Sequence, residues 1–88
     1  AIRTASVTLA FPSIAAGGGT QSLTTTITGA AVGDTVIVNR AGGSMPDAGT
    51  LLDAAVTSAN TVTIRDTNIT SAAITPISTT YRITVISY

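Results

Sequence analysis

Four Arg and four Asp side chains carry all of the charge in this 88-residue sequence. The sequence contains no His, Cys, Lys, Glu or Trp. Acid–base catalysis, nucleophilic catalysis and zinc binding need side chains that titrate, attack or bind metal, and the missing types are the usual ones. The composition therefore favours a structural or binding protein without a cofactor over an enzyme.

The aspartates allow two kinds of site. Residues 66–68 (DTN) resemble the Asp-Thr-Gly of aspartic proteases but lack the Gly, and two such carboxyls would have to share a proton at about 3 Å. We interpret Asp66 as a turn residue that bonds its own backbone. Asp34, Asp47 and Asp53 are candidate calcium ligands, but calcium takes six to eight oxygens and no EF-hand spacing is present. We therefore predict no metal site.

Two further motifs have a structural explanation. Residues 17–20 (GGGT) resemble part of a phosphate-binding loop, but no Lys follows and a strand is expected next, so we predict a flexible connector. Residues 68–70 (NIT) form a glycosylation sequon, which matters only in a secreted eukaryotic protein.

The arginines are scattered and almost no aromatic residues lie between them, which argues against nucleic-acid binding. No apolar run approaches the ~20 residues that span a bilayer, so no membrane partner is expected. Arg65 and Arg82 are expected on outward faces, where they are either solvated charges or contacts to a neighbouring subunit. The candidate interface residues are Arg3, Arg40, Met45, Arg65, Arg82 and Tyr88.

Apolar and polar residues alternate with period two along most of the chain, the pattern of half-buried strands. The segment 50–57 also permits a short helix, but its neighbours favour a strand. The hairpin of 50–57 with 61–66, through a turn at 58–60, is the clearest pairing. Strands are predicted at residues 4–11, 20–28, 35–41, 50–57, 61–66 and 80–88.

The fold predicted from this spacing is all-β, a small antiparallel β-sandwich or barrel of about six to eight short strands. Residues 1–88 form one domain, and residues 1–4 allow an extended N-terminal arm. Tyr81 and Tyr88 are expected in the core or at an interface. The predicted core consists of Val7, Leu9, Phe11, Leu23, Ile27, Val36, Val38, Val62, Ile64, Ile83 and Val85.

The low charge suggests a subunit of an assembly. The net charge is zero and 9% of the residues are charged, whereas soluble surfaces carry roughly 25–35%. A small domain without disulfide or zinc also has oligomerisation as its remaining means of stabilisation. The alternative explanation is compositional drift toward Ala and Thr.

Several segments together resemble small virion proteins of tailed bacteriophages. They are residues 28–36 (TGAAVGDTV), 56–65 (VTSANTVTIR), 68–70 (NIT), Pro76 and 80–86 (TYRITVI). The resemblance implies a β-sandwich that decorates or cements the capsid exterior as a homotrimer bound to the major capsid protein. The alternative it leaves open is a head- or tail-fibre module for host or carbohydrate recognition. The shared pattern is structural, and it implies no catalytic residue.

Overall fold

A computed structural model describes residues 1–42 and 48–88, so the predicted interface residue Met45 lies outside the described residues. The described part is all-β and contains no helix. This confirms the predicted fold class and the strand assignment of 50–57. The strands are β1 (Ile2–Leu9), β2 (Gly19–Thr26), β3 (Thr35–Arg40), β4 (Thr50–Ser58), β5 (Thr61–Asn68) and β6 (Thr79–Ile86).

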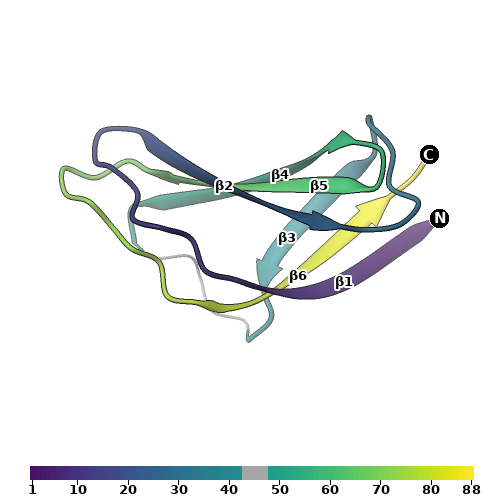
Figure 1. Cartoon of the computed structure of the whole chain (residues 1–88), viewed down its shortest axis with the longest axis horizontal. Helices are drawn as coiled ribbons and strands as arrows, with labels where there is room; N and C mark the ends of the chain where they lie inside the picture. The colour runs from purple at the N-terminus through teal and green to yellow at the C-terminus, as the bar shows by residue number, and fades with distance from the viewer. Residues whose placement is uncertain (43–47) are drawn as a thin grey trace.

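The strands form two three-stranded antiparallel sheets that face each other (Figure 1). The first sheet has the order β1-β6-β3 and the second has the order β2-β5-β4. Two separate sheets make the fold a small β-sandwich rather than a barrel. The predicted hairpin is present as β4–β5, with Asn60 at a φ of 63° in its turn. An Asn tolerates this left-handed backbone conformation better than most residues.

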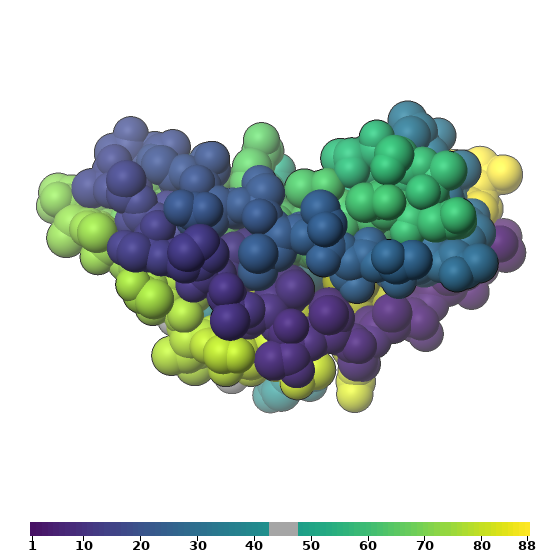
Figure 2. Space-filling view, viewed as in Figure 1, coloured from purple at the N-terminus to yellow at the C-terminus, as the bar shows by residue number. Residues whose placement is uncertain are grey.

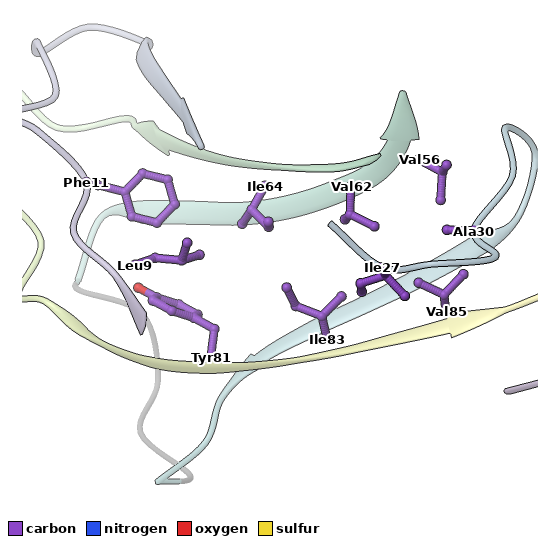
Figure 3. Packing of buried hydrophobic residues seen from close by; sticks show 10 residues of the cluster. All are labelled: Leu9, Phe11, Ile27, Ala30, Val56, Val62, Ile64, Tyr81, Ile83 and Val85. Atoms are coloured by element: carbon purple, nitrogen blue, oxygen red, sulfur yellow. The ribbon is translucent and has the colours of Figure 1, made fainter. Parts of the chain in front are cut away.

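The core lies between the sheets and is built from alternate residues of each strand (Figure 3). Ile83 and Val85 of β6 face Val62 and Ile64 of β5, and all four side chains are fully buried. Most predicted core residues are confirmed as buried, and four of them lie at the margin, partly buried against the cluster. These four are Val7, Leu23, Val36 and Val38.

The sequence placed some boundaries wrongly. Ile2 to Thr4 belong to β1, paired with Ile86 to Thr84, and they form no extended arm. Backbone pairing with β6 satisfies amide groups that a free arm would leave to water. The first strand also ends at Leu9, where its pairing with Thr79 of β6 ends, and not at the buried Phe11 as predicted.

Asn68, at the end of β5, organises the loops beyond it. Its Nδ2 donates to the carbonyl oxygens of Ile14 (3.1 Å) and Ala72 (2.8 Å). Its Oδ1 accepts from the backbone N–H of Thr70 (2.9 Å) and the Thr70 hydroxyl (2.6 Å). Asn68 is fully buried. The sequon is therefore a structural element here, since its amide nitrogen is enclosed and already bonded.

Candidate functional site

The outer face of the first sheet, which we call the Arg82 face, has a guanidinium at its centre. Arg82 lies between the buried residues Tyr81 and Ile83, so its side chain points outward from the middle strand β6. Ser6 of β1 and Asn39 of β3 flank it in register. A hollow of about 210 Å³ lies at this position. Its lining residues are Thr4, Ala5, Ser6, Arg82 and Thr84.

The same face becomes apolar toward the chain termini. Ile2 and Ile86 pair across β1 and β6, and Ile37 lies on β3 opposite Thr84, one outward position nearer to Arg82. The Tyr88 hydroxyl lies 2.6 Å from the Thr35 hydroxyl, which holds the ring beside this patch. Ile2 is 71% exposed and Tyr88 is 93% exposed. In the space-filling view the first and last residues, purple and yellow, lie together at this end (Figure 2).

The outer face of the second sheet has a matching guanidinium that is already paired. Arg65 projects from the middle strand β5, and its Nε donates to Asp53 Oδ1 at 3.0 Å while Nη2 donates to Oδ2. The hydrogen bond and charge of Asp53 raise the pKa of Arg65. Beside it, the hydroxyls of Thr57 and Thr63 lie 2.8 Å apart. A hollow of about 220 Å³ at this position is therefore lined by a neutral ion pair and hydroxyl groups.

Arg3, Ser87 and Asp34 form a hydrogen-bonded group near the chain termini, which we call the terminal cluster. Arg3 Nη1 donates to the Ser87 hydroxyl at 2.9 Å, and that hydroxyl donates to Asp34 Oδ2 at 2.8 Å. The backbone N–H of Ala31 also donates to this carboxylate at 2.9 Å, and these bonds hold the pKa of Asp34 below its usual value. Gly29 sits against the guanidinium, where an added Cβ would lie 2.4 Å from Arg3 Nε. Asp34 thus fastens the loop before β3 to the chain termini.

Arg40 lies inside the sandwich. It is 8% exposed, and its guanidinium carbon lies 5.9 Å from the centre of the Tyr81 ring, a cation–π geometry. Phe11 meets the same ring edge-on, with 6.1 Å between the ring centres. Two of the three aromatic rings in the chain are therefore in the core, and Tyr88 alone among them is exposed.

No protein-family model, curated protein or solved structure matches this chain. The resemblance to phage virion proteins therefore remains a prediction from the sequence. The interface assignments of Arg3, Arg40, Met45, Arg65, Arg82 and Tyr88 likewise remain predictions.

The remaining motifs lie apart from the Arg82 face. Asp66 lies within β5 with 1% of its surface exposed, so its interpretation as a turn residue is wrong, and Asp53 is bonded to Arg65. Asp47 lies outside the described residues. In residues 1–42 and 48–88, no three acidic, His or Cys side chains gather in a group able to hold a metal ion. Those residues also contain no helix long and apolar enough to cross a membrane.

The site that sequence reasoning missed is the grouping on the Arg82 face. Arg82 and Tyr88 were predicted separately, whereas Ile2, Ile37 and Ile86 were assigned no surface role. The group could have been found from the outward-facing positions of these strands if the register between the strands had been known. That register joins strands distant in sequence, and local patterns do not specify it.

Proposed function

We propose that this chain is a capsid decoration protein of a tailed bacteriophage, which binds the assembled shell and stabilises it through protein–protein contacts. Support comes from the sequence resemblance and from a fold that agrees with it. The observation that weighs most is the combination of an almost uncharged surface with exposed large apolar side chains. On the described surface these are Ile2, Val32, Ile37, Leu51, Ile69, Ile77 and Tyr88.

Where such side chains lie close together, as Ile2, Ile37 and Tyr88 do at one end of the first sheet, they are typical of surfaces that other proteins cover. A subunit that spends its lifetime packed against a shell needs little charge for solubility. Such a subunit stabilises the assembled shell by mass action, because it binds that state and not the separated capsid proteins. Symmetry favours three-fold positions on the capsid exterior, occupied by a homotrimer next to the major capsid protein.

The edge strands offer a second mode of contact. The edge strands are β1 and β3 in the first sheet, and β2 and β4 in the second. Within the described residues each edge strand has a ladder partner on one side only. A strand of the capsid protein that pairs with one of these edges would extend the sheet by backbone hydrogen bonds.

Gradient-purified virions from the source of this chain provide the test. We expect mass spectrometry to find the protein in stoichiometric amounts, and we expect particles stripped of it to release their DNA at a lower temperature than intact particles. Virions without stoichiometric protein would reject the proposal.

The alternative is a fibre module that binds carbohydrate, and it predicts signals on a glycan array. Sugar sites usually need aromatic platforms, and Tyr88 is the exposed aromatic residue.

A further inference from the structure

The described part of the chain leaves one arginine without an internal partner. Arg82 makes no hydrogen bond or ion pair there, in contrast to Arg3, which bonds Ser87, and Arg65, which bonds Asp53. Arg40 is enclosed against Tyr81. Arg82 therefore presents a full positive charge and five donor N–H groups to whatever covers this face.

The groups around Arg82 suit a carboxylate. The side chains of Thr4, Ser6 and Thr84 line the hollow with it, and within the described residues their hydroxyls form no hydrogen bonds. A guanidinium binds a carboxylate through two parallel N–H···O bonds, and hydroxyl groups donate to the lone pairs that remain. The hollow, at about 210 Å³, has room for an acidic side chain.

The apolar patch beside the hollow indicates a protein partner. Ile2, Ile37, Ile86 and Tyr88 lie on the same face, toward the termini, and would be covered with the hollow. Arginine and tyrosine are enriched among the interface residues that contribute most to binding. A nucleic acid would need several clustered cations, and this face has one.

We propose that the Arg82 face is the surface that docks on the shell, and that a carboxylate of the capsid protein pairs with Arg82 while apolar capsid side chains cover Ile2, Ile37, Ile86 and Tyr88. This inference rests on the proposed function and specifies its surface and partner chemistry. Covering the face removes water from the ion pair, which strengthens the attraction between its charges.

The matched pair Arg82→Gln and Arg65→Gln tests the proposal. Each substitution removes one guanidinium from the middle of an outer sheet face, and each residue is exposed, so both variants are expected to fold. Purified particles lacking the protein are titrated with each variant, and bound protein is measured by co-sedimentation. We expect Arg82→Gln to bind about 30-fold more weakly or worse, and Arg65→Gln to bind within about threefold of the unsubstituted protein.

The outcomes separate this inference from the proposed function. If the unsubstituted protein does not bind particles, the proposed function is rejected. If it binds and Arg82→Gln binds equally well, or both variants lose affinity equally, the docking surface is wrong and the function stands. If light scattering shows a self-association that Arg82→Gln abolishes, a second copy of the chain occupies the face and the capsid carboxylate is rejected.

A direct probe examines the hollow without particles. Acetate is titrated against isotope-labelled protein at constant ionic strength, with chloride as the control anion. We expect the Nε–H resonance of Arg82 to shift with acetate more than that of Arg65, which is bonded to Asp53. Equal shifts at the two arginines would overturn the assignment of a carboxylate site.

Discussion

The outer faces of the two sheets share a plan and differ at one decisive position. In each sheet a middle strand presents an arginine, flanked in register by a serine on one edge strand: Ser6 beside Arg82, and Ser22 beside Arg65. On the other edge strand, Asn39 lies opposite Arg82, whereas Asp53 lies opposite Arg65.

A neutral amide in place of a carboxylate leaves one face with an unsatisfied cation and the other neutral. The hollows at the two arginines are nearly equal in volume, about 210 and 220 Å³, so volume does not distinguish the faces. The comparison teaches that one side chain on an edge strand decides whether a central arginine is paired within the described part of the chain.

The largest effects are expected inside the sandwich, where the two sheets should behave alike. Ile83 and Ile64 are both fully buried on middle strands. Ile83→Ala and Ile64→Ala should each lower the free energy of unfolding by about 2–5 kcal/mol, because each leaves a cavity between the sheets. Urea denaturation measures both. Losses that differ by more than the error would show that the sheets differ in their cores as well as outside.

The next largest loss of stability is expected at the buried Asn68, and an exposed asparagine provides the control. Asn68→Ala should cost about 3 kcal/mol, since it removes the buried amide that joins Ile14, Ala72 and Thr70 through four hydrogen bonds. The matched control Asn39→Ala, on the Arg82 face, should change stability by no more than about 0.5 kcal/mol. A large loss in the control would mean that the Arg82 face is structural.

A smaller effect concerns the terminal cluster, which joins the first sheet to the loop before β3. The pKa of Asp34 is lowered in the folded state, chiefly by the Ala31 N–H and then by Ser87, so its contribution is present above its usual pKa of 3.8. The contribution is lost as pH falls through the folded pKa. Asp34→Asn should therefore lower the urea midpoint at about pH 6 and have a smaller effect at about pH 2.5. A pH-independent difference would contradict this.

The smallest effect on stability is expected when Asn39, opposite Arg82, is replaced by Asp, or Asp53, opposite Arg65, by Asn. Asn39→Asp should give Arg82 an internal partner and raise the urea midpoint slightly, whereas Asp53→Asn should lower it slightly. Both changes should shrink in about 1 M salt, because exposed ion pairs are screened. Particle binding is the sharper measurement: Asn39→Asp should weaken it, since Arg82 is then neutralised within the chain. Unchanged binding by a folded Asn39→Asp variant would show that the pairing state of Arg82 does not matter for particle binding.

The sequence predicted the positions of the strands better than it predicted which strands and side chains pair with one another. Alternation located the strands and most of the core, because period two is a local property. Ile14 was missed: it is fully buried and bridges Ile74, across a gap that no local pattern spans. The pairing of Arg65 with Asp53 depends on the register of the β4–β5 hairpin, which places the two residues opposite each other. The neighbours of Arg82 come from strands remote in the chain, so the absence of a partner for it among residues 1–42 and 48–88 was not predictable.

The pairing of the first strand with the last has a consequence for synthesis. Residues 19–68 contain all three strands of the second sheet, whereas β1 pairs with β6 alone in the first sheet and must wait for residues 79–86. Closing such a long loop is slow compared with forming a hairpin. A ribosome-bound or truncated chain that stops before residue 79 therefore lacks the strand that joins β1 to β3. Arg82 therefore lies between Ser6 and Asn39 only after residues 79–86 have been made, so the proposed docking face is completed late in synthesis.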